Sequence, residues 1–201
     1  MRALFRLLVV LLVISGLAAL AAGLTFLARG ISAQQEPGRV ESALAPRLRS
    51  MAIPSSAKHT PNPVPASPEA VKAGMAHFAD HCAICHGNDG SGDTEMGRHL
   101  YPRVPDMRKP ETQNLTDGEL FYIIENGVKL TGMPAWGGAH GGSDSSWKLV
   151  DFIRHLPGLT PDELKEMKRL NPKGPDEEDA DAFLKGDTPP EHAHKHGGEG
   201  K

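Results

Sequence analysis

Uncharged residues are concentrated near the start of this 201-residue chain. Leu7 to Ala28 is a run of 22 residues without a charge, and Arg2 and Arg6 precede it. About 20 apolar residues are needed to span the hydrocarbon core of a bilayer, whereas the apolar region of a secretory signal has about 7–15. We therefore expect residues 1–28 to form an uncleaved membrane anchor. The alternative is a cleaved signal peptide, with Ala19 to Ala21 as its small-residue cleavage pattern.

Apolar periodicity is absent from residues 29–66, which are rich in Pro, Ala, Ser and Gln. This composition predicts a flexible linker that holds the following domain away from the membrane. A helix start comes next, because Ser67-Pro68-Glu69 combines an N-cap serine, a proline at the first helical position and an acid that complements the helix dipole. We expect this helix to reach about Asp80. Its buried stripe is predicted to contain Val71, Gly74, Met75 and Phe78.

Amphipathic patterns predict three further helices in the second half of the chain. The capping box Thr116-Asp117-Gly118-Glu119 begins a helix that ends near Gly127. Another helix runs from about Ser145 to His155 and is stopped by Pro157. A short helix capped by Thr160 follows, to about Leu170. The buried face of the 145–155 helix is expected to include Trp147, Leu149, Val150, Phe152, Ile153, Arg154 and Leu156.

These patterns place one compact domain at residues 67–157, followed by a short helix and a charged, histidine-containing tail at 158–201. A core of this size is marginal by apolar burial alone, so a bound group that supplies apolar surface would be needed. The net charge of −3 and the pI near 6.4 offer no electrostatic basis for binding nucleic acid.

The chemistry of the compact domain is concentrated in Cys82-Ala83-Ile84-Cys85-His86. Cys-x-x-Cys-His is the attachment signature of a c-type haem. Residues three apart lie on the same side of a helix, so the two thiols can reach the two vinyl groups of one porphyrin while His86 lies beneath the iron. We expect Cys82 and Cys85 to bind one haem c covalently and His86 to be an axial ligand.

Two other kinds of site contain Cys-x-x-Cys. A zinc site would need further ligands, which His77 and His81 would have to provide because the chain has no third cysteine. A redox dithiol would need a thioredoxin-like strand and helix around it, whereas the residues before Cys82 have a helical pattern.

The order of these features resembles a class I monohaem cytochrome c over about Ser67 to Leu156. The run from Leu115 to Gly127, followed by Thr131-Gly132-Met133-Pro134-Ala135-Trp136, is similar to the methionine-ligand half of small bacterial cytochromes c. The resemblance implies an all-α fold, with three to four helices wrapped around one covalently attached haem. It also implies that Gly74 and Phe78 of the first helix pack against Phe152 of the last.

Met133 is the expected distal ligand of the iron. Glycine before it lets the backbone approach the haem, and proline after it stiffens the loop. The other candidates for this position are Met96, Met107, His99 and His140. The resemblance further implies that His86 donates its second ring N–H to a proline carbonyl, with Pro102 and Pro105 as candidates.

Histidine and methionine ligation leaves no open position on the iron, which predicts an electron carrier rather than an enzyme. Arg2 and Arg6 predict that the N-terminus stays in the cytoplasm and that the haem domain is on the periplasmic side of the bacterial cytoplasmic membrane. The expected partners are membrane-bound or periplasmic electron donor and acceptor proteins. The alternative is an open distal site that serves a peroxidase or a gas sensor.

The C-terminal residues His192, His194 and His196 have a metal-binding composition. Because their surroundings are polar and charged, we favour a solvated tail over a metal site.

Overall fold

The computed structural model describes residues 2–30, 32–138 and 142–172. Within these ranges the chain is helical and contains no strand, so the expected all-α fold is confirmed. The C-terminal histidines lie outside the described residues.

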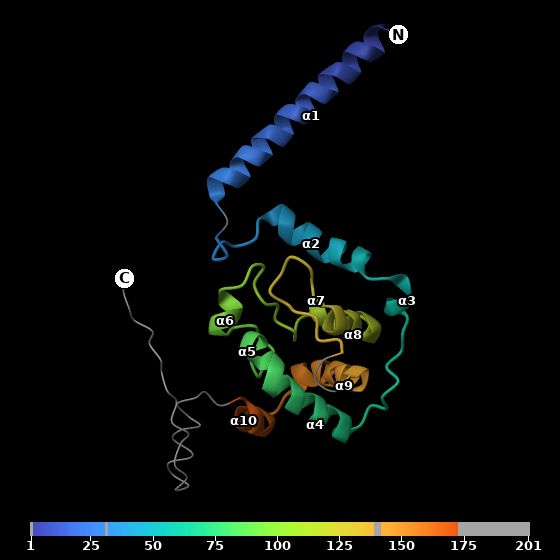
Figure 1. Cartoon of the computed structure of the whole chain (residues 1–201), viewed down its shortest axis with the longest axis vertical. Helices are drawn as coiled ribbons and strands as arrows, with labels where there is room; N and C mark the ends of the chain where they lie inside the picture. The colour runs from blue at the N-terminus through green and yellow to red at the C-terminus, as the bar shows by residue number, and fades with distance from the viewer. Residues whose placement is uncertain (1, 31, 139–141, 173–201) are drawn as a thin grey trace, which may run out of the picture.

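The N-terminal apolar run forms one long helix, α1 (Arg2–Arg29), which projects from the other helices (Figure 1). Its large apolar side chains are exposed, from Leu4 to Leu27. Residues 2–28 are long and apolar enough to cross a membrane.

Two helices occupy the segment in which sequence analysis predicted no helix. They are α2 (Arg39–Ala52) and the short α3 (Ser55–Lys58). Both contact the domain that follows: the Thr116 hydroxyl donates to the carbonyl oxygen of Lys58 at 2.8 Å, and Ile53 is buried. Part of the predicted linker is therefore folded against the domain.

The first helix of the domain is α4 (Pro68–His77), and the Ser67 hydroxyl accepts its cap hydrogen bond from the Ala70 N–H at 3.1 Å. The chain then widens into a π-helical turn, Phe78–Cys82, before α5 (Ala83–His86). The predicted helix therefore continues beyond Asp80 to His86, with a change of pitch. Such π-bulges are frequently found at functional sites.

The remaining predicted helices are confirmed. They are α8 (Asp117–Asn126), α9 (Gly142–His155) and α10 (Pro161–Leu170), and both α8 and α10 begin with a complete capping box. A 3-10 turn, Leu156–Gly158, joins α9 to α10. Two further short helices are α6 (Glu95–Arg98) and α7 (Pro110–Gln113).

The core of the domain forms where α4 crosses α9. A Cβ atom on Gly74 would lie 2.0 Å from the carbonyl oxygen of Lys148 and 3.0 Å from the Cβ of Phe152, so the absence of a side chain permits this close crossing. The ring centroids of Phe78 and Phe152 are 5.1 Å apart, and both side chains are buried. The packing expected for these three residues is confirmed.

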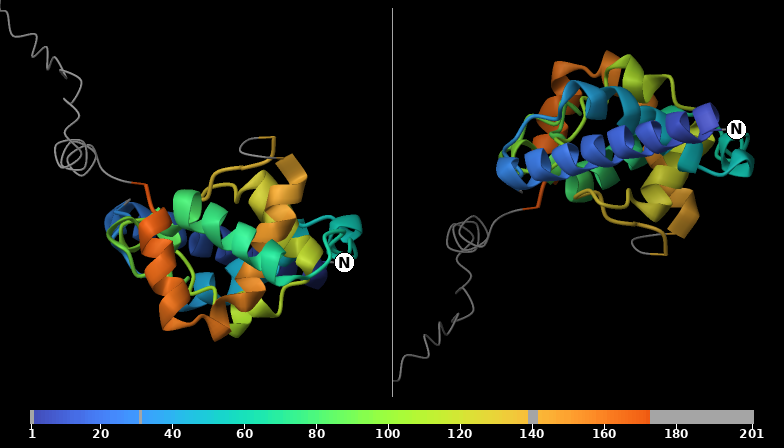
Figure 2. Two further views of the ribbon diagram at one scale, coloured as in Figure 1. Left: turned by 90° about the horizontal axis from the view of Figure 1, so that it is seen from below. Right: turned by 90° about the horizontal axis from the view of Figure 1, so that it is seen from above.

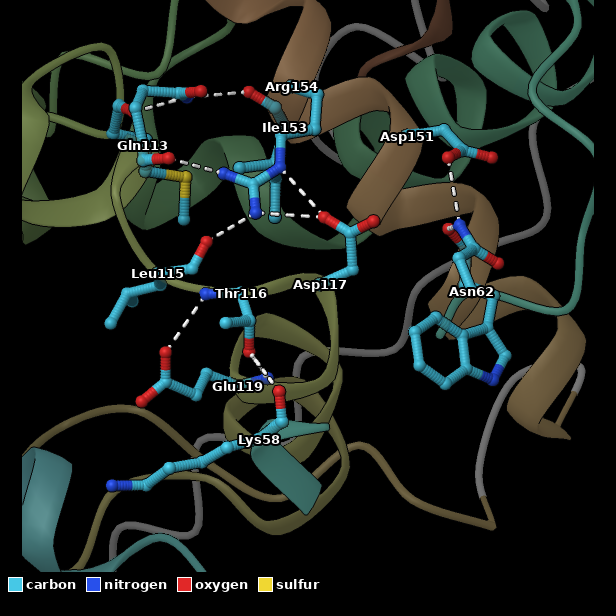
Figure 3. A network of polar contacts seen from close by, with 12 residues as sticks. Lys58, Asn62, Gln113, Leu115, Thr116, Asp117, Glu119, Asp151, Ile153 and Arg154 are labelled. Atoms are coloured by element: carbon cyan, nitrogen blue, oxygen red, sulfur yellow. Dashed lines mark hydrogen bonds and ion pairs between the residues drawn. The ribbon is translucent and has the colours of Figure 1, made fainter. Parts of the chain in front are cut away.

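Arg154 has a different role from the rest of the α9 face. The expected apolar residues of α9 are buried, but the Arg154 guanidinium is partly exposed and points at the start of α8 (Figure 3). Its Nε donates to the Asp117 carboxylate at 2.9 Å, and its terminal nitrogens donate to the carbonyl oxygens of Gln113 and Leu115. One charged side chain thus links α9 to the segment that leads into α8.

Candidate functional site

The candidate site begins at the π-helical turn, where α4 meets α5. Cys82 lies at the end of this turn, Cys85 lies in α5, and both thiols are half-buried and unpaired. Burial, together with Cys85 and Asp80, raises the pKa of the Cys82 thiol to about 12, and burial also raises the pKa of Cys85. Both cysteines are therefore protonated thiols at neutral pH.

His86 ends α5 and is turned into the protein. Its side chain is 8% exposed, and its ring centroid lies 6.2 Å from that of Phe78. Burial lowers the pKa of His86 to about 4, so its imidazole is neutral at pH 7, the form that binds metal. Its Nδ1 atom is buried and has no hydrogen-bond partner, so neither Pro102 nor Pro105 accepts from it in this structure.

The loop after His86 turns back against α5. Gly87 adopts a φ of 72°, and the Gly92 N–H donates to the carbonyl oxygen of His86 at 2.8 Å. Thr94, which sequence analysis missed, donates its hydroxyl to the carbonyl oxygen of Cys85 at 3.0 Å and caps α6 by accepting from the Gly97 N–H at 2.8 Å. Its position before Glu95 is an N-cap signal that could have identified it.

The methionine segment is held against the C-terminal end of α8. The Met133 N–H donates to the Thr131 hydroxyl at 3.1 Å, and the Met133 carbonyl oxygen accepts from the Val128 N–H at 3.1 Å. The Trp136 N–H donates to the carbonyl oxygen of Ile124 at 3.0 Å. Met133 itself is half-buried, on a loop with backbone hydrogen bonds on both sides.

The structure brings the cysteine motif and the methionine segment together. His81, the residue before Cys82, stacks on Trp136, with ring centroids 5.7 Å apart and an angle of 18° between the planes. Trp136 is three residues after Met133, so two segments more than fifty residues apart in the sequence meet at this stack. Neither residue was expected to have this contact.

The other candidates for the distal position differ in placement. Met96 and His99 are exposed, and Nδ1 of His99 is 2.8 Å from the carbonyl oxygen of Glu95. Met107 is partly buried against the hydrophobic core. His140 lies outside the described residues.

The donor set fits a haem better than a zinc ion. Among the described residues, no group of three or more His, Cys, Asp or Glu side chains could hold a metal ion, which argues against the zinc alternative. Two unpaired thiols within one helical segment, beside a buried neutral imidazole with an unpartnered Nδ1, fit covalent attachment and axial ligation of a haem.

Comparisons with known proteins agree with this assignment. Residues 69–153 match the family model "Cytochrome C oxidase, cbb3-type, subunit III". The chain is 33% identical over 97 residues to the cbb3-type cytochrome c oxidase subunit FixPc of Rhizobium leguminosarum bv. viciae, which is 48% of this chain and 31% of that relative. It is 35% identical over 95 residues to the cbb3-type cytochrome c oxidase subunit FixP of Rhizobium meliloti (strain 1021). This second match covers 47% of this chain and 30% of that relative. The chain thus spans about a third of the length of these curated relatives.

Proposed function

We propose that this chain is an electron carrier tethered to a membrane, with a covalently bound haem as its cofactor. The match of residues 69–153 to the cbb3-type subunit III family model, together with the FixP relatives, supports this proposal. Cys82 and Cys85 would hold the haem through thioether bonds, and His86 and Met133 would be its axial ligands. When bound, the haem supplies one-electron redox chemistry, and a thioether ligand raises its reduction potential.

The protein side chains position and shield this group. The buried, neutral His86 needs no deprotonation to act as a ligand, and Phe78 and the core of α9 exclude water from its side of the site. The hydrogen bonds around Met133 orient the loop that carries the second ligand. Two neutral ligands on a rigid frame suit electron exchange, because little rearrangement accompanies a change of charge.

The stack of His81 on Trp136 is the observation that carries this proposal. It brings the attachment motif and the methionine segment to the same region of the domain, which a six-coordinate haem requires. An open distal site, as in a peroxidase or a gas sensor, would need no methionine segment there.

The location and partners are part of the same proposal. Residues 1–28 would be an uncleaved single-pass anchor, with residues 29–66 connecting it to the haem domain, 67–157, on the periplasmic side. The named relatives are subunits of a cbb3-type cytochrome c oxidase. We therefore propose that this chain passes electrons within a membrane respiratory complex of that kind, with other membrane-bound or periplasmic redox proteins as donor and acceptor.

The deciding experiment is Met133→Ala in the haem-loaded chain. Loss of a soft sulfur ligand and entry of water would lower the reduction potential and allow the ferrous protein to bind carbon monoxide. Met96→Ala, at an exposed methionine, is the matched control and should change neither property. Unchanged potential and carbon monoxide binding in Met133→Ala would show that another residue holds the sixth position.

Attachment and anchoring have separate tests. Replacing both Cys82 and Cys85 with alanine should abolish the haem-stained band on a denaturing gel, and a persisting band would contradict the thioether assignment. The intact mass of the membrane-bound protein should include residues 1–28, whereas a chain that begins after Ala21 would indicate a cleaved signal peptide.

A further inference from the structure

Helix α2 has an exposed apolar stripe. Val40, Leu44, Leu48 and Met51 follow one another at spacings of four, four and three residues, which places them on one side of a helix. Their exposed fractions are 72%, 46%, 59% and 79%. Four large exposed apolar side chains in one row form a patch of the kind that marks an interaction site.

The helix also lacks internal sources of stability. Pro46 lies inside it, where a proline removes a backbone hydrogen bond and clashes with the preceding turn. No residue of α2 is buried, and a helix of 14 residues is marginal in water by itself. Burial of the apolar stripe would supply the missing stabilisation.

Two residues of α2 contact the domain. The Tyr101 hydroxyl donates to the Glu41 carboxylate at 2.5 Å, and the Arg49 guanidinium donates to the carbonyl oxygen of Glu111 at 3.4 Å. Arg49 lies on the side of the helix opposite the apolar stripe, and the buried Ile53, directly after the helix, continues that side. Glu41 lies at the edge of the stripe, seven residues before Leu48. The stripe therefore faces away from the domain.

The position of α2 in the chain identifies what covers the stripe. Nine residues, 30–38, separate the end of α1 from the start of α2. Fully extended, they reach at most about 30 Å, so α2 cannot move far from the membrane surface that α1 enters. In Figure 1, α2 lies between α1 and the other helices, and in the view from above in Figure 2, α1 passes in front of those helices. The exposed Arg39 and Arg47 give the helix a positive charge that suits anionic lipid headgroups.

We infer that α2 lies in the headgroup region of the membrane, with Val40, Leu44, Leu48 and Met51 in lipid. Its opposite side holds the haem domain through Arg49, and Glu41 adds a contact at the edge of the stripe. A further link, from Arg103 to Glu36 at 2.7 Å, reinforces this contact. The haem domain then has one fixed orientation toward the bilayer instead of moving freely on a linker. This inference rests on the proposed function, because it requires α1 to be the anchor.

Thiol accessibility in lipid nanodiscs tests the inference. The haem-loaded full chain is reconstituted at one chain per disc, in phosphatidylglycerol and phosphatidylcholine, so that no second copy and no partner protein is present. Leu48→Cys and the control Ser42→Cys, at an exposed position on the opposite side of α2, are compared by alkylation with a membrane-impermeant maleimide. The native cysteines are blocked by their thioether bonds.

We expect the cysteine at position 48 to react about tenfold more slowly than that at position 42, because an apolar environment raises the thiol pKa and lowers the fraction of reactive thiolate. Arg47→Gln, or discs of neutral lipid alone, should reduce this difference. Equal alkylation rates at positions 48 and 42, in discs that retain the chain, would overturn the inference. The apolar stripe of α2 would then be the binding surface for a second copy or a partner protein. Elution of the chain separately from the discs would instead contradict the proposed anchor.

Discussion

Replacing Gly74 with alanine tests the helix crossing on which the haem domain is built. The substitution adds one methyl group to α4 at the point where α9 comes closest. That Cβ would be 2.0 Å from the carbonyl oxygen of Lys148 and 2.7 Å from its carbonyl carbon. Both atoms belong to the backbone, so no side-chain rotation can relieve the contact and the two helices must move apart.

Two opposing effects determine the magnitude. Alanine is favoured over glycine in a helix by about 1 kcal/mol. Overpacking of a core costs about 1–3 kcal/mol, and a contact this short with backbone atoms belongs at the upper end of that range. We therefore expect the Gly74→Ala variant to lose about 2 kcal/mol of unfolding free energy, the upper overpacking cost less the gain in propensity.

The assay is guanidinium unfolding of the haem-loaded chain in detergent, followed by tryptophan fluorescence, which a bound haem quenches in the folded state. A lower guanidinium concentration at the unfolding midpoint, with an unchanged dependence of the unfolding free energy on guanidinium concentration, reports the loss of stability. Ala73→Gly, at an exposed position of the same helix, is the control and should cost only about 1 kcal/mol through propensity. If Gly74→Ala is as stable as the parent or more stable, the crossing is not as close as the structure shows.

Two further predictions concern the methionine loop and the pH dependence of stability. Gly127 has a φ of 65°, and a Cβ atom there would lie 2.7 Å from the Met133 carbonyl oxygen. Gly127→Ala should therefore lower the unfolding free energy by about 1–3 kcal/mol and shift the reduction potential. An unchanged potential would show that this turn does not position the ligand loop. Burial tends to raise the pKa of Glu163, but hydrogen bonds from Thr160 and His155 outweigh it and hold the pKa below the usual 4.5. The stability that Glu163 contributes is therefore complete above pH 4.5 and is lost as the pH falls through the lowered pKa. Glu163→Gln should reduce the fall of the thermal unfolding midpoint with decreasing pH in this acid range. The same fall in the variant and the parent would refute this.

The local signals in the sequence predicted most of the domain correctly. The helix starts at Ser67, Thr116 and Thr160 could be identified because a capping side chain satisfies backbone N–H groups only two or three residues away. The face of α9 could be predicted because helical spacing determines which side chains share a face. The contact of Gly74 with Phe152, which joins two helices, was instead implied by the resemblance to class I cytochromes c.

Features that depend on distant residues were not predictable in this way. The segment 29–66 has no strong apolar pattern of its own, and α2 is held on the domain by Tyr101 and Glu111, about sixty residues away in the sequence. The stack of His81 on Trp136 and the turn of Arg154 toward Asp117 likewise join separate segments.

The sequence by itself therefore determined the chemistry of the Cys82–His86 motif and the local order of the helices, because both depend on residues that are only a few positions apart. The tertiary structure alone decided that the methionine segment meets this motif and that α2 turns its apolar stripe away from the domain. These outcomes depend on how the helices pack against one another. The conformational entropy lost in ordering the intervening chain is offset only when distant side chains pack together.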